Sequence, residues 1–194
     1  MKIIICGMTA SGKSTLSKKL VKKYGLGYAC GGDALKELAR EEGYKYSGPG
    51  WWETPDGQLF LKRREKDPTF DKKVDQKLLQ IAKSKRKVLL DSWTLAWLLV
   101  KEKNTLKIWL KCTPLARAQR AAKRDGTSVA QASKALKHKD DESKRIYREL
   151  YGFRLEEDLA PFDLAVDTSR LDEHTVYKIV SCYIDNMLKA GYIK

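Results

Sequence analysis

The chain has 194 residues, of which 42% are hydrophobic and 33% charged, enough for one domain with its own core. With 39 basic and 25 acidic residues its net charge is +14, which favours polyanionic ligands and argues against cationic ones. No apolar run approaches the length of a membrane span and no leader-like segment opens the chain, so we expect a cytoplasmic monomer without membrane contact. The four cysteines are dispersed away from the two histidines, which argues against a zinc site.

Apolar runs alternate with helical patterns along the chain, which predicts an α/β fold with a parallel sheet and helices on both faces. The expected strands are 2–6, 27–30, 87–91, 106–110 and 164–167. The expected helices are 13–24, 33–42, 70–84, 114–124, 128–151 and 172–190. The stretch 43–69 is rich in glycine and proline, so we expect an irregular insertion there.

A complete G-x-x-x-x-G-K-[ST] motif lies between the first expected strand and the first expected helix. Its residues are Gly7, Met8, Thr9, Ala10, Ser11, Gly12, Lys13 and Ser14. In this context backbone N–H groups converge on an anion at the positive end of a helix. Lys13 then reaches the β- and γ-phosphates, and Ser14 offers its hydroxyl to Mg²⁺. We therefore predict that the motif and Thr15 bind a nucleoside triphosphate.

Asp91 closes the third expected strand. At the carboxyl end of a parallel strand its side chain would face the crevice beside the phosphate loop, where it could hold Mg²⁺ with Ser14. The alternative is a polar residue that merely ends a strand.

A basic helix follows the fourth strand, with Arg117, Arg120 and Arg124 on one face. Because Asp125-Gly126-Thr127 comes next, this helix is typical of a lid that closes over transferring phosphates. The next helix would form the opposite wall with Lys139, Lys144, Arg145 and Arg148. Solvated helix charge is the alternative for at least half of these residues.

Candidates for binding a second substrate follow the second strand. Asp33 comes directly after Gly31-Gly32, and Lys36 lies one helical turn further on. Asp33 could instead be only a helix N-cap. Trp51 and Trp52, in the irregular insertion, would either stack on a base or plug the core.

Several of these features together resemble the archaeal type of cytidylate kinase, in the nucleoside monophosphate kinase family of P-loop kinases. They are the phosphate loop, Gly32-Asp33 before a helix, the lid helix, Tyr151-Gly152, and the stretch from Phe162 to Ser169. The resemblance covers most of the chain and is best over 1–42 and 105–190. It implies one P-loop kinase domain, a sheet of order 2-3-1-4-5, an ATP and Mg²⁺ site, an acceptor region over 32–86 and a lid over 114–150. It also places Asp167, Thr168 and Ser169 near the adenine pocket.

The chain departs from this family where the acceptor phosphate would be held. Lys36 and Trp93 stand where the family has arginines, and Lys139-Asp140 replaces an Arg-Glu pair. Arg63 or Arg64 could supply the missing charge from the insertion. The acceptor-binding candidates are Asp33, Lys36, Trp93, Lys139 and Arg145.

Three hypotheses follow. The first is ATP-dependent phosphoryl transfer to a nucleoside monophosphate, most simply CMP or dCMP. The second keeps the chemistry but moves it to a hydroxyl of a nucleoside, a sugar or RNA, with Trp51, Trp52, Trp93 and Trp97 stacking on bases. The third is a non-catalytic ATP-binding module associated with RNA. The expected catalytic residues are Lys13, Arg117, Arg120 and Arg124.

Overall fold

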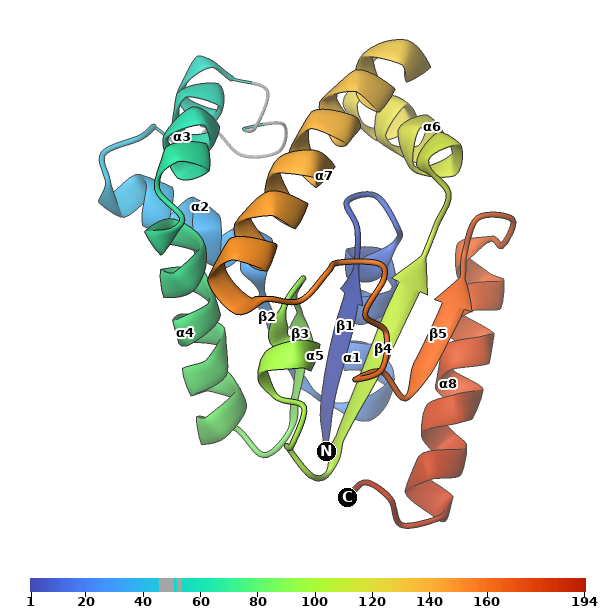
Figure 1. The fold of residues 1–194 in the computed structure, drawn as a ribbon. Helices are drawn as coiled ribbons and strands as arrows, with labels where there is room; N and C mark the ends of the chain where they lie inside the picture. The colour runs from blue at the N-terminus through green and yellow to red at the C-terminus, as the bar shows by residue number, and fades with distance from the viewer. Residues whose placement is uncertain (46–50, 52–53) are drawn as a thin grey trace.

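A parallel sheet of five strands, in the order β2-β3-β1-β4-β5, runs through the centre of the protein (Figure 1). Its strands are β1 (Lys2–Gly7), β2 (Gly27–Cys30), β3 (Val88–Asp91), β4 (Thr105–Lys111) and β5 (Leu164–Asp167). The computed structural model describes residues 1–45, 51 and 54–194. The predicted strands and their order are confirmed, with ends that differ from the predicted ones by at most one residue.

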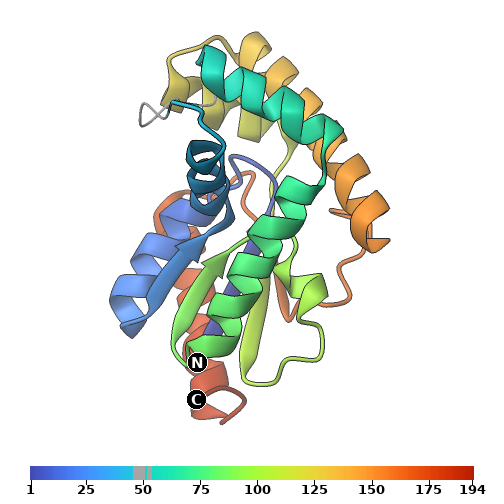
Figure 2. The ribbon, with the colours of Figure 1, turned by 90° about the vertical axis from the view of Figure 1, so that its left-hand side faces the viewer.

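Helices cover both faces of this sheet, as Figures 1 and 2 show. They are α1 (Lys13–Tyr24), α2 (Gly31–Glu41), α3 (Pro55–Lys66), α4 (Thr69–Ser84), α5 (Leu95–Leu98), α6 (Pro114–Asp125), α7 (Val129–Tyr151) and α8 (Glu173–Lys189). The helices α1 and α8 lie on one face, and α4, α5 and the end of α7 on the other. None of the helices in the described ranges is long and apolar enough to cross a membrane.

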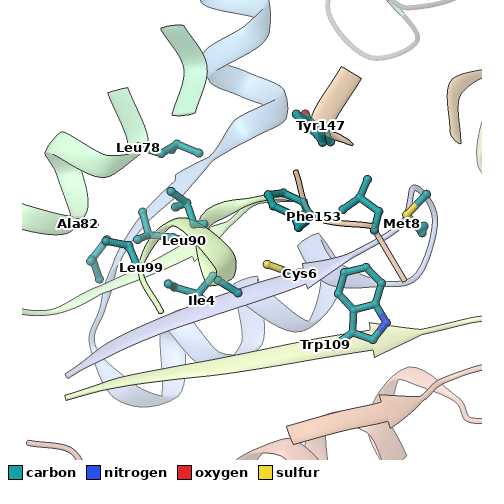
Figure 3. Close-up of a cluster of buried hydrophobic side chains, with 14 of the residues drawn as sticks. Ile4, Cys6, Met8, Leu78, Ala82, Leu90, Leu99, Trp109, Tyr147 and Phe153 are labelled. Atoms are coloured by element: carbon teal, nitrogen blue, oxygen red, sulfur yellow. The ribbon is translucent and has the colours of Figure 1, made fainter. Parts of the chain in front are cut away.

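The central strand β1 is buried on both sides, which is why it reads as an unbroken apolar run. Ile3 and Ile5 face the cluster that α1 and α8 complete. Ile4 and Cys6 face the opposite cluster, where Trp109 and Phe153 pack near them (Figure 3). Each side chain of this size contributes about 1.5–3 kcal/mol when fully buried.

Trp97 belongs to this second cluster and corrects one prediction. Its ring stacks on Phe153 with centroids 4.4 Å apart, and it meets Trp109 and Phe162 edge to face. Its Nε1 donates to Asp158 O at 2.8 Å. Trp97 therefore packs within the protein and is not a platform for a nucleic-acid base.

The segment 55–66, predicted to be irregular, forms the helix α3. Thr54 Oγ1 accepts a hydrogen bond from Gly57 N at 3.2 Å, and Pro55 occupies the first helical position. The run Pro55-Asp56-Gly57 therefore begins a helix instead of a loop, because the same residue types serve both purposes.

Trp51 plugs a small aromatic cluster under α3. It is fully buried with Ala39, Phe60 and Phe70, and its Nε1 donates to Lys45 O at 2.6 Å. Of the two alternatives, the core plug is confirmed for this residue. Trp52 lies outside the described residues, as do residues 46–50 and 53.

Candidate active site

The phosphate loop turns sharply out of β1 because two glycines allow it. Gly7 has φ +151°, and a Cβ there would lie 2.6 Å from Leu110 O. Gly12 has φ +100° and precedes α1 directly. Ala10 also lies in the left-handed region with φ 63°, which is uncommon for alanine and marks a constrained functional loop. Such a succession turns backbone N–H groups toward one concavity that suits an anion.

Lys13 is held against the inner rim of this loop. Its Nζ donates to Gly7 O at 2.8 Å and to Met8 O at 3.1 Å. The same nitrogen lies 5.9 Å from the ring centroid of Trp93. The amine is thus placed where the loop meets the segment that follows β3.

Asp91 and Ser14 are brought together beside the loop. Asp91 ends β3, which pairs with β1, and its side chain is buried. Ser14 Oγ donates to Asp91 Oδ2 at 2.8 Å, and Tyr28 OH donates to the same oxygen at 3.4 Å. A hydroxyl and a carboxylate are oxygen ligands of the kind that Mg²⁺ takes when substrate phosphates and water complete its shell. The described residues hold no cluster of three His, Cys, Asp or Glu that would form a self-contained metal site.

Two clefts meet at Lys13. The first has a volume of about 490 Å³ and is lined by residues 10–16, Arg120, Arg124 and residues of the segment 168–176. The second has a volume of about 410 Å³ and lies between the loop, the starts of α2 and α4, α3 and α7. Ala10, Lys13, Ser14 and Arg124 line both. Two ligands bound in these clefts would meet at the Lys13 ammonium group.

Arg120 fixes one wall of the first cleft. Its guanidinium donates to Thr168 Oγ1 at 3.1 Å, to Thr168 O, and to Ser11 O at 3.4 Å. Of the residues predicted for the adenine pocket, Thr168 lines this cleft, whereas Asp167 and Ser169 do not. Asp167 Oδ1 accepts from Ser169 N at 2.9 Å, and Ser169 Oγ accepts from Thr113 N at 2.9 Å. The last two residues therefore shape the turn after β5.

The three arginines of the predicted lid have different surroundings, although they share a helix. Arg117 is buried, pairs with Asp140 at 2.7 Å, and donates to Thr9 O at 3.3 Å. It lines neither cleft, and it joins α6, α7 and the phosphate loop. Arg124 lines both clefts and pairs with Asp125 at 2.6 Å. Arg117 is therefore a structural residue, whereas Arg120 and Arg124, which come later in the same helix, line the clefts.

A buried ion pair forms the floor of the second cleft. Arg64 Nε and Nη2 donate to the two carboxylate oxygens of Asp71, each at 2.8 Å. Tyr147 OH donates to Asp71 Oδ1 at 2.8 Å. Of the two candidates that the sequence offered, Arg64 lines this cleft, whereas Arg63 pairs with Glu42 at 2.8 Å.

Asp75 lies beside that pair. Burial raises the pKa of its carboxyl to about 6, against the hydrogen bonds it accepts. Thr94 Oγ1 donates to Oδ1 at 2.5 Å and Tyr151 OH donates to Oδ2 at 2.8 Å. The cleft thus holds a second carboxyl fixed in orientation by two hydroxyl groups.

Four of the five predicted acceptor-binding residues line the second cleft: Asp33, Lys36, Trp93 and Lys139. Asp33 and Lys36 pair at 3.2 Å, and because α2 begins at Gly31, Asp33 lies inside its first turn and is not its N-cap. The structure places Arg145 elsewhere, since it pairs with Glu142 and Glu149 and donates to Glu65 O at 2.9 Å.

Lys139 is a cation of this cleft whose pKa is lowered. Burial lowers the pKa of its ammonium group to about 8, and the neighbouring charges of Arg64, Lys13 and Arg124 add to that effect. The group therefore titrates close to neutral pH.

The sequence reasoning missed Asp71, Asp75, Tyr147 and Tyr151. Asp71 and Asp75 are four residues apart on α4, and Tyr147 and Tyr151 are four apart on α7, so each pair shares a helix face. The hydrogen bonds described above join the two faces. The available signal was the spacing of these two pairs, each four residues apart on a predicted helix.

The sheet order, the phosphate loop after β1 and the two clefts that meet at Lys13 together define a P-loop kinase. A family described as "AAA domain" matches residues 3–147. The chain is 34% identical to the cytidylate kinase of Methanocaldococcus jannaschii over 97% of its own length and all of that protein. It is 32% identical to the cytidylate kinase of Pyrococcus horikoshii, over 97% of this chain and 91% of that one. The chain belongs to the cytidylate kinase family, and it is an ATP-dependent kinase of the nucleoside monophosphate kinase type.

Solved structures confirm the fold. An uncharacterised protein from Eubacterium ventriosum matches with a TM-score of 0.67 at 18% identity, over 95% of this chain and 98% of that one. The deoxyadenosine kinase of M. mycoides matches with a TM-score of 0.55 at 18% identity, over 95% of this chain and all of that one. At these identities the likeness concerns the architecture alone.

Proposed function

We propose that the chain transfers a phosphoryl group from ATP, with Mg²⁺, to CMP or dCMP. The observation that carries this proposal is the meeting of the two clefts at Lys13 and Ser14, which would bring a donor and an acceptor into contact. The cytidylate kinase relatives support the cytidine base.

The first cleft would hold the donor. The N–H groups of residues 7–15 and Lys13 would bind the β- and γ-phosphates, and Thr168 would flank the adenine. Arg120 and Arg124 would neutralise the charge of the transferring group. Ser14 and Asp91 would hold Mg²⁺, which supplies further neutralisation across the phosphate oxygens when bound.

The second cleft would hold the acceptor. Lys36, Lys139 and Arg64 provide cations for its phosphate, in place of the arginines that the family has at Lys36 and Trp93. Arg64 uses Nε and Nη2 to hold Asp71, which leaves Nη1 for a ligand oxygen. A monophosphate is already an anionic nucleophile, so orientation and charge neutralisation suffice without a general base.

A substrate screen tests the proposal. Purified protein with Mg-ATP is expected to convert CMP or dCMP to the diphosphate faster than UMP or AMP, measured by chromatography of the nucleotides. If all four monophosphates stay unphosphorylated while ATP binds, the assignment of the acceptor is wrong.

The low pKa of Lys139 predicts a pH dependence. If its ammonium group binds the acceptor phosphate, kcat/KM for the acceptor will fall as the pH rises through about 8, because deprotonation removes the charge. The Lys139→Arg variant keeps its charge, so its profile is expected to stay level up to about pH 9. Identical profiles for the two proteins would remove Lys139 from acceptor binding.

A further inference from the structure

The sheet edge opposite the clefts is strongly basic. The strands begin at this edge, and both chain termini lie beside it in Figure 1. Two connections cross it, one between α4 and β3 and one between α5 and β4. We call their exposed basic residues, together with Lys83 in the last turn of α4, the amino-edge surface: Lys83, Lys85, Arg86, Lys87, Lys101 and Lys103.

Backbone hydrogen bonds place the two connections on either side of β1. The Met1 amine donates to Arg86 O at 3.0 Å, and Val88 N donates to Met1 O at 3.3 Å. On the other side, Lys2 N donates to Asn104 O at 3.3 Å. Since neighbouring strands lie about 4.8 Å apart, the two basic segments are separated by about 10 Å of backbone. The exposed cations of the two connections are therefore carried by neighbouring segments of backbone.

The charges of this surface are not balanced by acids. None of its six side chains makes an ion pair within the described residues. Glu102, the acid in these two segments, is held by Lys2 at 2.6 Å. The positive charge at this edge also acts on the Met1 amine. Its pKa is lowered by burial and then by the charges of Lys87 and Lys2.

A cavity lined by basic residues elsewhere in the described structure differs in this respect. It lies at the end of α7, and three of its four cations, Lys144, Arg145 and Arg154, pair with Glu156, Glu149 and Glu157, whereas Arg148 has no ion pair within the described residues. Paired side chains of opposite sign leave little net field. The amino edge instead groups six exposed cations, without ion pairs in the described part of the chain, on two neighbouring segments.

An exposed tyrosine lies two residues before Lys194, whose carbonyl group is bound at this edge. Tyr192 is 71% exposed, and the backbone next to it is anchored because the Met1 amine donates to Lys194 O. Cations that follow a phosphate backbone, together with an aromatic ring for a base, are the means by which proteins bind single strands. A lipid surface would need an apolar stripe, and the exposed large hydrophobic residues described at this edge are Val100 and Tyr192.

We propose that the amino-edge surface binds single-stranded nucleic acid, at a site separate from both clefts. The lysines and Arg86 neutralise successive phosphates, and the Tyr192 ring stacks on a base. This site lies at the opposite end of the β-strands from the clefts. The kinase can therefore work while the nucleic acid is bound. Binding of nucleic acid at this site would account for a part of the net charge of +14 that binding of nucleotides alone does not require.

The experiment compares two variants of equal charge. One carries Lys85→Gln, Arg86→Gln, Lys87→Gln and Lys103→Gln at the surface. The control carries Lys66→Gln, Lys72→Gln, Lys134→Gln and Lys178→Gln, four exposed lysines with no ion pair in the described ranges. Binding of a short fluorescent oligouridine RNA and of the matching DNA is measured by anisotropy across a range of salt concentrations.

The surface variant is expected to bind at least about 10-fold more weakly, with its salt slope reduced by roughly 2–3 because each lost phosphate contact removes about 0.7. The control should change less than about 2-fold, and Tyr192→Ser should weaken binding without changing the slope. Equal losses in both quadruple variants, or binding to anionic lipid vesicles without binding to RNA or DNA, would overturn the proposal. Kinase activity should be unchanged in both, so this test is independent of the acceptor assignment.

Discussion

Replacing Lys13 by alanine is expected to lower kcat for phosphoryl transfer by about 10³-fold while the protein stays folded. The ammonium group lies where the two clefts meet, and it is held there by two carbonyl groups of the phosphate loop. Charge that develops on the transferring phosphoryl group would lose its nearest fixed partner. The charge-assisted hydrogen bonds that this group donates to Gly7 O and Met8 O lie within the loop, so we expect their loss to cost the fold less than it costs the reaction.

The measurement is steady-state kinetics with Mg-ATP, with circular dichroism as a check on folding. Lys22→Ala is the matched control, because Lys22 is an exposed lysine on the same helix. It should retain wild-type kcat. A Lys13→Ala enzyme that keeps more than about a tenth of wild-type kcat would contradict the role assigned to this ammonium group.

Replacing Arg64 by alanine is expected to have the largest effect on stability. The substitution leaves Asp71 buried without its cation, which costs about 3–5 kcal/mol of unfolding free energy. For a chain of this length that corresponds to a fall in Tm of roughly 6–20 °C. The KM for the acceptor should rise as well, because the variant lacks the guanidinium that lines the second cleft.

A double variant separates these two effects. Arg64→Met with Asp71→Asn removes both charges and keeps an acceptor for the Tyr147 hydroxyl, so most of the lost Tm should return. The KM for the acceptor should stay high. If the double variant recovers both Tm and KM, Arg64 is only a structural residue.

The sheet could be predicted from the sequence because its signals are local. The strand Lys2–Gly7 is apolar from Ile3 to Cys6 because both its faces are covered there, and the phosphate loop after it has a fixed spacing. The helix α3 was missed because Pro55 and Gly57 mark a turn as readily as a capped helix. Whether Thr54 caps a helix depends on a geometry that residue types alone do not give.

The site was harder to predict because the spacing of residues along a helix does not tell how deeply each side chain is buried. Arg117 and Arg120 share a face of α6, yet Arg117 pairs with Asp140 and lines neither cleft. Arg64 could not be placed until α3 was seen to pack against α4 and α7. Distant contacts of this kind follow from tertiary packing, which no short motif records.

The wall that the two clefts have in common makes their ligands thermodynamically linked. Lys13 and Arg124 belong to both, so an anion on one side lowers the positive potential felt on the other. By reciprocity, whatever one nucleotide does to the affinity of the second, the second does equally to the first. In such an enzyme neither substrate has a single dissociation constant, and each has one value for the free protein and another for the half-filled one.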